Sequence, residues 1–546
     1  MIPIDTHRTL GEAFFEAVRR HGPAPFLAVP PHPGREYHPD GIEIGYAAAG
    51  HAVRALMAQY AQAGYGGGHR IALLLENRPE HLLHKLAMNA LGACCVPINP
   101  DYRAGEIAYL LDHSKVDLVV VLGSRLTQLE AGMAEASRRP PVALFEGFDG
   151  PSGVPPATRP PDGRVPDGDT PASILYTSGT TGRPKGCVLS HRYELASGEA
   201  YATRGGLATV RIGAERIYNP LPLYHVNASI LSFCCVMLTG NCQVQSDRFH
   251  PSRFWDEVRQ TRATVVHYLG VMVPMLLSRP GGPDDRRHAV RFGFGAGVEP
   301  QLHAVFEQRF GFPLLELWGM TEMVRALVAC HEPRQVGTRA FGRALPGVEA
   351  RVVDEADREL PDGTPGELVI RHSEATPRQD FFSGYLDDPE ATEAAWRGGW
   401  FHTGDLVTRD ETGMLHFVDR RKNIIRRSGE NIAAAEVEAL LLTHPEVAQA
   451  AVMAVPDEVR EEEVLACVVP RRPLDDAGRE RLAKELVAFC LAQLAYFKAP
   501  GWMWFCDAIP TTGTQKIQRH AIFPGQRDPR QLAGMLDLRP LKKRGG

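Results

Sequence analysis

Residues 176–186, "YTSGTTGRPKG", have the composition of a loop that binds an anion, because three glycines, four Ser or Thr hydroxyls and Lys185 fall within eleven residues. Successive backbone N–H groups of a glycine-rich turn form a concavity for anionic oxygens, and the hydroxyls add hydrogen-bond donors. Lys185 adds a point charge suited to a polyphosphate. A plain surface turn is the alternative, but so concentrated a composition favours phosphate.

The spacing within this segment differs from that of the Walker P-loop. That motif requires a glycine, four residues, and then Gly-Lys followed by Ser or Thr. Counted from Gly179 or from Gly182, the second glycine would fall on Pro184 or on Cys187. The segment is therefore predicted to hold phosphate in a loop of another kind.

The sequence around this loop predicts strands that alternate with helices. Residues 69–77 form a buried apolar run, and residues 78–93 have a helical pattern with a proline near its start. Valine-rich runs at 116–123 and 263–270 each end in glycine. This alternation predicts an α/β fold class, with β-sheets flanked by helices in a large N-terminal domain.

Two changes of pattern mark the organisation of the chain. Residues 149–170 are dense in Pro, Gly and Asp, which predicts a surface connection that leads to the glycine-rich segment. After Asp419 the elements become shorter, and about 120 residues of this kind predict a small α+β domain. Its expected elements are a helix at 434–444, strands at 447–455 and 462–470, and a helix at 479–494.

Composition limits the partners and the compartment. A chain of 546 residues is too long for one compact core, so at least two domains are expected. The 60 basic and 65 acidic residues give a net charge of -5, which argues against nucleic acid as a partner. No apolar run approaches the roughly 20 residues of a membrane span, so no integral membrane segment is expected. The ten cysteines lack a C-x-x-C spacing and are expected to be buried thiols of a cytoplasmic protein.

The glycine-rich segment resembles the signature of the adenylate-forming superfamily, which includes acyl-CoA synthetases, adenylation domains of peptide synthetases and luciferases. Six further segments resemble motifs of that family in the same order, at 222–228, 294–300, 316–322, 400–405, 419–432 and 509–517. Trp318 stands where tyrosine is usual, and Gln515 stands where glycine more often precedes the lysine. The segment at 419–432 also resembles the corresponding segment of crotonobetaine/carnitine-CoA ligases. This resemblance concerns the hinge region between the domains and does not indicate which acid is bound.

The resemblance implies a two-step reaction with ATP, Mg²⁺ and coenzyme A. A small-molecule carboxylic acid attacks the α-phosphate of ATP, which gives an acyl-adenylate and pyrophosphate. The thiol of coenzyme A then displaces AMP. The first step brings two anions together, so it needs cations and oriented donors rather than a covalent nucleophile.

The family motifs imply roles for particular residues. Those implied to wrap the β- and γ-phosphates are Thr177, Ser178, Gly179, Thr180, Thr181, Gly182 and Lys185. Those implied on the adenine and ribose side are Gly295, Ala296, Gly297, Glu316, Trp318, Gly319, Asp405 and Arg420. The implied catalytic set is Lys516, His225, Thr321 and Glu322, with Glu322 and Thr180 holding Mg²⁺. Lys516 would bridge the substrate carboxylate and the α-phosphate. The alternative for Lys516 is a solvated side chain, and the alternative for Trp318 is an aromatic residue of the core.

The small domain is implied to rotate between the two half-reactions. The resemblance divides the chain into residues 1–421 and a mobile domain of residues 422–546, with the active site between them and Lys422 as the hinge. Gly429 would line the tunnel for pantetheine, where a side chain would block a narrow channel. Phe497 and Lys498 resemble the patch that holds the nucleotide of coenzyme A. A homodimer is expected only because many relatives are dimers.

The acid itself stays open at this stage. The implied pocket contains His225, Asn227, Met323 and Arg325. His225 resembles a gating aromatic, with a hydrogen-bonded core histidine as the alternative. Arg325 could hold a second anionic group of a dicarboxylic acid, but an ion pair or an outward-facing position is the favoured interpretation.

Three other functions compete with a carboxylic acid–CoA ligase. An adenylating enzyme could load a carrier-protein thiol, although the tail beyond Gln518 has no attachment motif. A luciferase-like oxygenase has no specific support. A catalytically silent nucleotide-binding scaffold is disfavoured, because the residues implied in catalysis are all present. The expected function is therefore ATP-dependent, AMP-forming ligation of an acid to coenzyme A.

Overall fold

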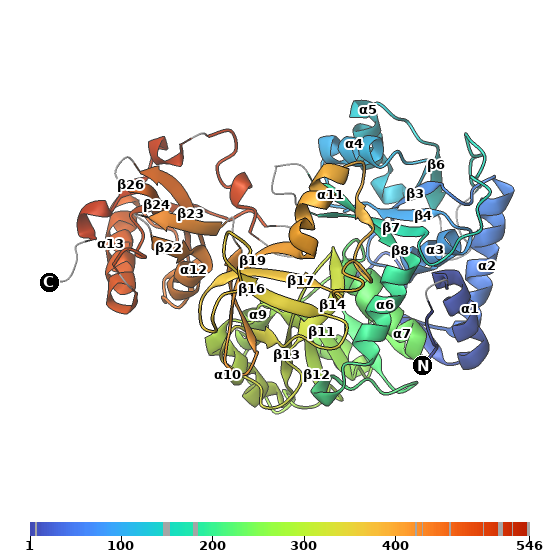
Figure 1. Ribbon diagram of the computed structural model, residues 1–546, viewed down its shortest axis with the longest axis horizontal. Helices are drawn as coiled ribbons and strands as arrows, with labels where there is room; N and C mark the ends of the chain where they lie inside the picture. Colours follow the sequence, from blue (N-terminus) through green and yellow to red (C-terminus); the bar gives the residue numbers. More distant parts are fainter. Residues whose placement is uncertain are drawn as a thin grey trace. The chain divides into compact units, whose positions relative to one another are not determined.

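The computed structural model describes residues 1–546 except 6–7, 146–152, 178–183, 421–422, 428–429, 458–459, 495, 512–516, 527 and 543–546. Contacts between residues divide the chain into two compact units (Figure 1). The first is Met1–Glu349 with Ile370–Phe401, and the second is Ala350–Val369 with His402–Gly546. The expected α/β class is confirmed, whereas the expected boundary between residues 421 and 422 stays a prediction.

A seven-stranded sheet in the first unit carries the glycine-rich segment. Its order is β18 (Gly384–Tyr385), β8 (Lys185–Ser190), β7 (Pro171–Thr177), β4 (Cys94–Pro97), β3 (Arg70–Leu74), β5 (Leu118–Leu122) and β6 (Val142–Phe145). Strands β3 to β7 pair in parallel, and β8 pairs antiparallel with both β7 and β18. The expected strands at 69–77 and 116–123 are confirmed as β3 and β5.

Both faces of this sheet are buried, which is why its strands read as continuous apolar runs. Ile71 and Leu73 are as fully buried as Ala72 and Leu74. Helix α2 (Tyr46–Gln62) precedes β3 in the chain. The helices between the strands of this sheet are α3 (Pro79–Ala90), α4 (Ala104–His113) and α5 (Leu126–Glu135), with a 3-10 turn η1 (Gly123–Arg125). The expected helix at 78–93 is confirmed as α3, which begins at Pro79 because its missing N–H would be unpaired there in any case.

An eight-stranded sheet completes the first unit. Its order is β14 (Met323–Val328), β13 (Leu314–Met320), β12 (Phe292–Ala296), β11 (Val265–Leu269), β9 (Arg216–Asn219), β10 (Cys242–Gln245), β1 (Pro25–Val29) and β2 (Ile42–Gly45). The inner strands are parallel and the outer pairs β13–β14 and β1–β2 are antiparallel. The expected strand at 263–270 is confirmed as β11.

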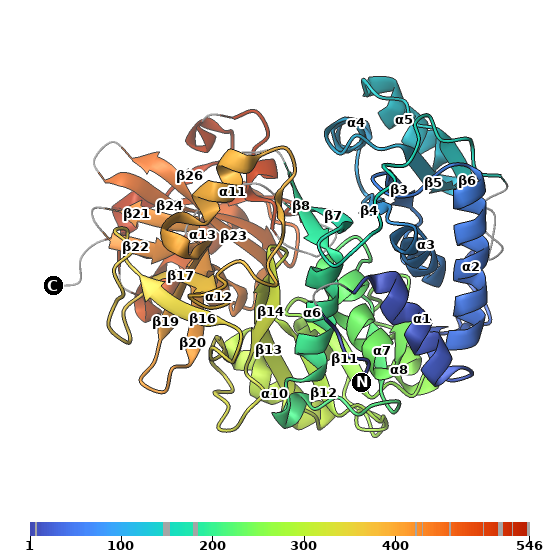
Figure 2. The same cartoon turned by 45° about the vertical axis from the view of Figure 1, so that its right-hand side comes forward.

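The first unit also contains the remaining helices and several short elements. They are α1 (Leu10–His21), α6 (His191–Ala202), η2 (Gly206–Ala208), the π-helix η3 (Asn227–Ser232), α7 (Phe233–Thr239), α8 (Phe254–Gln260), α9 (Met272–Leu277), α10 (Pro300–Phe310), β15 (Ala340–Gly342), α11 (Pro389–Ala395) and η4 (Arg397–Gly399). Helix α1 packs against α2 and α3 (Figure 2). It begins in a capping box, in which Thr9 accepts from the backbone N–H of Glu12 and the Glu12 carboxylate accepts from that of Thr9.

The second unit contains most of four neighbouring strands and the C-terminal elements. The four strands lie in the order β20 (Leu415–Arg420), β19 (Phe401–Arg409), β17 (Gly366–Arg371) and β16 (Glu349–Val353). The C-terminal elements are β21 (Ile424–Arg427), β22 (Glu430–Ala433), α12 (Ala434–Leu442), β23 (Val447–Asp457), β24 (Glu461–Pro470), α13 (Asp476–Gln493), β25 (Trp502–Phe505), η6 (Arg519–Ala521), η7 (Pro529–Gln531), β26 (Leu536–Asp537) and η8 (Arg539–Leu541). The four elements expected for the small domain are confirmed as α12, β23, β24 and α13.

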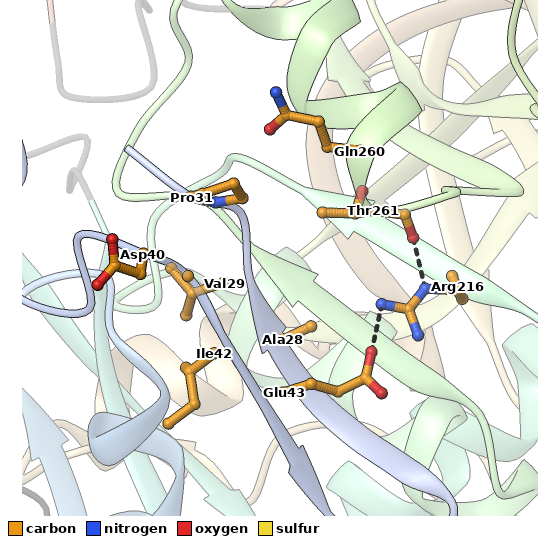
Figure 3. Close-up of a pocket in the computed structure, with 10 residues that line it drawn as sticks. Ala28, Val29, Pro31, Asp40, Ile42, Glu43, Arg216, Gln260 and Thr261 are labelled. Carbon is orange, nitrogen blue, oxygen red and sulfur yellow. Dashed lines mark hydrogen bonds and ion pairs between the residues drawn. The ribbon is translucent and has the colours of Figure 1, made fainter. Parts of the chain in front are cut away.

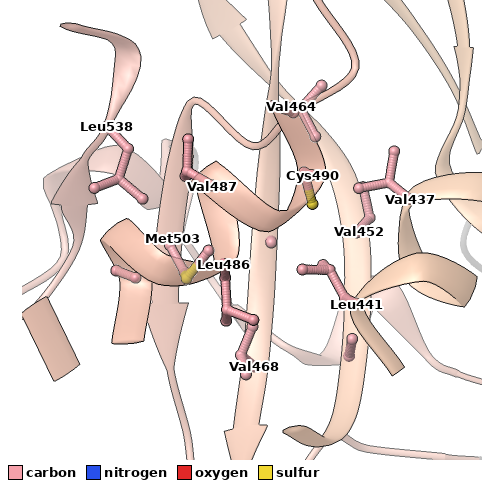
Figure 4. Packing of buried hydrophobic residues seen from close by; sticks show 14 of the residues in the cluster. Val437, Leu441, Val452, Val464, Val468, Leu486, Val487, Cys490, Met503 and Leu538 are labelled. Carbon is pink, nitrogen blue, oxygen red and sulfur yellow. The ribbon is translucent and has the colours of Figure 1, made fainter. Parts of the chain in front are cut away.

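The core of the C-terminal elements is aliphatic. Helices α12 and α13 pack on the sheet through Val437, Leu441, Leu486, Val487 and Cys490, which meet Val452, Val464, Val468 and Met503 (Figure 4). The polar faces of both helices remain outside this cluster. The alternation of apolar and polar positions in the sequence is thus the reason why these helices cover one face of the sheet.

Three expectations about the rest of the chain can be compared with the structure. Residues 153–170 contain no helix or strand and are mostly exposed, as expected of a connection. All ten cysteines are free thiols, and nine of them are buried, as expected. Among the described residues, no helix has the length and apolar character needed to cross a membrane.

Candidate functional site

The glycine-rich segment connects two paired strands. Thr177 ends β7, Lys185 begins β8, and the two residues are opposite each other in the antiparallel ladder. The residues between them that were expected to bind phosphate are Ser178, Gly179, Thr180, Thr181 and Gly182, and they lie outside the described residues. Thr177 and Lys185, the two described residues of the predicted phosphate loop, therefore lie at the base of this hairpin.

Lys185, Tyr385 and Glu322 form one cluster at this base. The Lys185 ammonium lies 4.7 Å from the centre of the Tyr385 ring, and the Tyr385 hydroxyl donates to Glu322 Oε1 at 2.9 Å. Lys185 Nζ is also 3.6 Å from Asp388 Oδ2. Burial and the adjacent Glu322 carboxylate raise the pKa of Tyr385 well above its ordinary value, so its hydroxyl remains a donor.

Glu322 is a buried carboxylate with only 6% of its surface exposed. Its backbone carbonyl accepts from Phe382 N at 3.0 Å, which fixes the start of β14 next to β18. A single buried carboxylate suits Mg²⁺, because this ion commonly takes one or two carboxylates together with substrate phosphates and water. In the described part of the chain, no group of three or more His, Cys, Asp or Glu side chains could hold a metal ion.

Glu316 fixes the glycine loop that follows β12. Its carboxylate accepts from Gly297 N at 2.8 Å and from the Tyr268 hydroxyl at 2.6 Å. Burial raises the pKa of Glu316, and these hydrogen bonds oppose that effect. Gly295 packs so tightly on Tyr268 that a Cβ would lie 2.2 Å from the Tyr268 carbonyl oxygen. The backbone of residues 295–297, including Ala296, is therefore held in one conformation.

The motif residues at the end of β13 differ in exposure. Trp318 is buried, with its ring centre 5.9 Å from that of Phe341, whereas Gly319 is exposed. Such burial is also what a core aromatic would show, so stacking on adenine stays a prediction. The backbone carbonyl of Thr321 accepts from the Tyr193 hydroxyl at 2.5 Å, which ties this turn to α6.

The segment at 222–228 leads into the π-helix η3. His225 is half-buried beside Tyr224, with ring centres 4.6 Å apart, and its carbonyl accepts from Ser229 Oγ at 2.9 Å. Asn227 Oδ1 accepts from Asn219 Nδ2 and bonds to His267 Nδ1. π-Helical turns are uncommon and occur often at functional sites.

Arg325 on β14 is held in an ion pair. Its Nε and Nη2 atoms lie 2.8 Å and 2.7 Å from Asp380 Oδ2, and Arg192 Nε lies 3.2 Å from Asp380 Oδ1. The ion pair that the sequence favoured over a substrate contact is thus present. Met323, the first residue of β14, is fully buried.

Asp405 and Arg420 face each other in the second unit. They are opposite residues of β19 and β20, and Arg420 Nε lies 3.3 Å from Asp405 Oδ1. Asp419 accepts from the backbone N–H groups of Arg420 and Ala435, at 2.6 Å and 2.8 Å. The structure therefore brings together the two residues expected to bind ribose.

The expected cations of the C-terminal elements are paired where they are described. Lys498 Nζ lies 2.7 Å from both carboxylate oxygens of Glu436. Arg519, a cation close to Lys516 in the sequence, bonds to Glu438 at 2.5 Å. Phe497 packs against the aliphatic core. The hinge residue, the tunnel glycine and the bridging lysine, namely Lys422, Gly429 and Lys516, lie outside the described residues.

Sequence reasoning missed Tyr385 and Asp380. Both act on predicted site residues across long separations, with Tyr385 63 positions from Glu322 and Asp380 55 positions from Arg325. The available signal was the sequence after Tyr385, where Asp388 caps α11 by accepting from Ala391 N and Pro389 follows it. A cap at that position indicates a fixed turn, but not what the preceding tyrosine contacts.

A surface hollow lies away from the predicted site residues. It has a volume of about 300 Å³ and is lined by residues of β1, β2 and the end of α8 (Figure 3). Arg216 in its wall pairs with Glu43 at 2.8 Å and donates to the Thr261 carbonyl at 2.5 Å. None of the predicted site residues lines it, and its arginine is already paired with Glu43.

Comparison with known proteins gives matches along most of the chain. An AMP-binding enzyme family model matches residues 5–386, and the model of the AMP-binding enzyme C-terminal domain matches residues 436–516. The sulfoacetate–CoA ligase of Cupriavidus necator is 32% identical over 478 residues, which cover 84% of this chain and 88% of that protein. The crotonobetaine/carnitine–CoA ligase of Citrobacter koseri is 29% identical over 489 residues, which cover 87% and 92%.

Solved structures are similar over nearly the whole length as well. ATP-bound MatB from Rhodopseudomonas palustris has a TM-score of 0.77 and 26% sequence identity, covering 94% of this chain and 98% of that one. The similarity therefore extends through both units and is not confined to one motif.

Proposed function

This chain belongs to the AMP-binding enzyme family and is an ATP-dependent carboxylic acid–CoA ligase, and we propose that the residues of its motifs perform the two steps of that reaction. In the first step, an oxygen of the acid attacks the α-phosphate of ATP, and pyrophosphate leaves. In the second step, the thiol of coenzyme A attacks the acyl carbon of the adenylate and AMP leaves. A carrier-protein acceptor is not favoured, because the relatives are named as CoA ligases.

The cluster of Lys185, Tyr385 and Glu322 is the observation that carries this assignment of roles. A cation at the base of the predicted phosphate hairpin lies against the ring of a tyrosine whose hydroxyl orients a buried carboxylate. Lys185 supplies positive charge for the polyphosphate, and Glu322 supplies the oxygen that Mg²⁺ prefers. When bound, Mg²⁺ would neutralise charge on the departing pyrophosphate.

The nucleotide is held by backbone geometry and by the Asp405–Arg420 pair. Because Glu316 fixes residues 295–297, their backbone presents a rigid edge to the adenine. The Asp405 carboxylate accepts hydrogen bonds from the ribose hydroxyls, and Arg420 keeps that carboxylate oriented. Trp318 stacks on the base.

The C-terminal residues act in turn. Lys516 bridges the substrate carboxylate and the α-phosphate during adenylation. Rotation about Lys422 then presents Gly429 to the pantetheine of coenzyme A, with Phe497 and Lys498 near its nucleotide.

A direct assay tests the proposal. The purified protein is incubated with ATP, Mg²⁺, coenzyme A and a panel of acids, and AMP and acyl-CoA are measured by mass spectrometry. Glu322→Gln should remove most acid-dependent AMP, while Asp387→Asn, which changes an exposed partner of Lys115, should leave AMP formation intact. Equal AMP formation by Glu322→Gln and the unchanged protein would contradict the assigned role of Glu322. Acid-dependent AMP without acyl-CoA would indicate a carrier-protein acceptor instead.

A further inference from the structure

A buried network of uncharged polar groups lies beneath the π-helix η3. Asn219, at the end of β9, donates through Nδ2 to Asn227 Oδ1 at 3.0 Å and to Ser232 Oγ at 2.9 Å. Ser232 Oγ donates in turn to Gln243 Oε1 at 3.0 Å. Asn219, Ser232 and Gln243 are fully buried. Ordinary packing would use apolar groups here, so this polarity needs a separate explanation.

A backbone group fixes the orientation of the whole network. Leu221 N donates to Asn219 Oδ1 at 3.0 Å, so the other end of the Asn219 amide must be its NH₂ group. That NH₂ group is a donor only, and therefore Asn227 must present its oxygen. The amide orientation of Asn227 follows from hydrogen bonding and is not an arbitrary choice between oxygen and nitrogen.

His267 on β11 supplies a second donor to the same oxygen. Its Nδ1 lies 2.7 Å from Asn227 Oδ1, and its Nε2 lies 3.0 Å from the Tyr201 hydroxyl. Burial lowers the pKa of His267 to about 3, so the ring is neutral and carries its proton on Nδ1. Nε2 then accepts from Tyr201. The network of Asn219, Asn227, His267 and Tyr201 has no net charge.

The Asn227 NH₂ group is the outward end of this network. Asn227 is half-buried, whereas both donors to its oxygen are fully buried, so its nitrogen lies on the accessible side. Within the described part of the chain, Nδ2 of Asn227 makes no hydrogen bond. Because hydrogen bonds to Oδ1 fix the Asn227 amide, its NH₂ group is already oriented to donate to an acceptor on a ligand.

We infer that Asn219 and His267 are positioning residues that fix the Asn227 amide, so that its NH₂ group selects an acid bearing an uncharged hydrogen-bond acceptor, such as a hydroxyl, ketone or amide oxygen. This inference rests on the proposed function and on the family resemblance, which implies that Asn227 lies in the pocket for the acid. A second anionic group is disfavoured as the partner, since a buried anion needs a cation and the network offers none. Arg325 does not supply one freely, because Asp380 already pairs with it.

The test uses pairs of acids that differ only in an oxygen substituent against a methyl or methylene group at the same position. The quantity compared is the ratio of kcat/KM for the two members of each pair, measured by AMP release. The unchanged protein should favour the oxygen-bearing acid of at least one pair by about tenfold or more, the effect of one well-formed hydrogen bond. Asn227→Leu should reduce that ratio to about one. Asn227→Asp should reverse the ratio for a ketone-bearing acid, because an acceptor would then face an acceptor, whereas a hydroxyl could still donate to the new carboxylate.

The positioning role of His267 must be tested with a measurement that a loss of stability alone would not change. His267→Leu should raise KM for the oxygen-bearing acid while KM for its methyl partner stays the same. His267→Gln keeps a donor toward Asn227 and should restore the preference. Tyr218→Phe, which removes a buried hydroxyl bonded to Glu257 outside this network, is the matched control and should leave the ratio unaltered.

The outcomes separate this inference from the function beneath it. Acyl-CoA formation with no preference in any pair, or with the same preference in Asn227→Leu, would overturn the inference alone. So would a preference for dicarboxylic or sulfonated acids over both members of the pairs. If no acid in the panel gave acid-dependent AMP, the proposed function would fail, and the inference with it.

Discussion

At the scale of single residues, the Tyr385 hydroxyl links the phosphate hairpin to Glu322. Its hydrogen bond to Glu322 Oε1 is charge-assisted, and bonds of that kind are worth about 1.5–3 kcal/mol. Tyr385→Phe keeps the ring that lies over Lys185 and removes only this bond. We expect kcat/KM for adenylation to fall by about 10- to 100-fold, measured by acid-dependent pyrophosphate release.

A Tyr→Phe substitution away from the predicted site is the control for Tyr385→Phe. Tyr218→Phe removes a buried hydroxyl that donates to Glu257 Oε2 at 2.7 Å, away from the predicted site residues. It should lower the unfolding temperature without changing adenylation. Equal effects of the two substitutions on adenylation would show that Tyr385 acts only through stability.

Arg325 is predicted to have a structural role. Because Asp380 is almost fully buried, loss of its arginine partner should leave a poorly compensated charge, with Arg192 as the remaining contact. Arg325→Met should therefore destabilise the first unit by about 1–3 kcal/mol in chemical denaturation. The ratio of activities on dicarboxylic and monocarboxylic acids should not move. A selective loss of dicarboxylate activity would instead place Arg325 at the substrate.

Local composition determined how far single residues could be predicted. The phosphate segment was recognised from its own concentrated composition, and Asp405 and Arg420 were recognised because their motifs resemble those of the family. Their opposition on adjacent strands is a finding of the structure. Tyr385 and Asp380 were missed because their partners are more than fifty positions away, and such contacts leave no local pattern. The network beneath Asn227 joins β9, β10, β11, α6 and η3, and its separations of 8 to 66 positions do not follow the period of any one helix or strand, so no local pattern predicts it.

At the scale of secondary-structure elements, one buried ion pair ties together α3, β7 and α6. Lys85 Nζ lies 2.7 Å from Ser173 Oγ and 2.7 Å from Glu194, and none of the three side chains is more than 2% exposed. Burial opposes the charge of Lys85, but its interactions with neighbouring groups, of which the Glu194 carboxylate is the strongest, together raise the pKa of Lys85. Strand β7 leads directly into the phosphate segment, so the pair anchors that hairpin.

Breaking this pair on one side should be costly. Lys85→Met would leave the Glu194 carboxylate buried without its cation, and the expected loss is about 3–5 kcal/mol of unfolding free energy. The double variant Lys85→Met/Glu194→Leu should be much closer to the unchanged protein. Chemical denaturation measures both, and Lys115→Met, which breaks an exposed pair with Asp387, should cost less than about 1 kcal/mol. A double variant as unstable as Lys85→Met would contradict the ion-pair explanation.

Elements were predictable where hydrophobic periodicity was clear. Strands β3, β5 and β11 and helices α3, α12 and α13 follow from apolar runs and helical spacing in the sequence. The two-residue strand β18 and the π-helix η3 could not be predicted in this way. Pairing with β8 defines the first, and the hydrogen bonds of Asn227 and Ser232 help to define the second.

At the scale of the whole molecule, the proposed hinge should separate the two half-reactions. The family assignment supports a chain in which one site serves adenylation and then thioester formation. Lys422→Pro fixes φ near −65° and removes a backbone N–H, so the hinge could not alternate between two conformations. One half-reaction should then fall on the order of 10²-fold relative to the other. Lys422→Ala keeps the backbone free and is the matched control, expected to support both.

Lys516 gives the complementary measurement. Lys516→Ala should slow adenylation on the order of 10²–10³-fold, because it removes one transition-state cation. Transfer from a synthetic acyl-adenylate to coenzyme A should persist, since that step no longer needs this cation. Adenylation is followed by pyrophosphate release and transfer by acyl-CoA formation, so each variant yields a ratio of two rates. If Lys422→Pro and Lys516→Ala slowed both half-reactions equally, a single fixed arrangement would explain the chemistry and the rotating unit would be excluded.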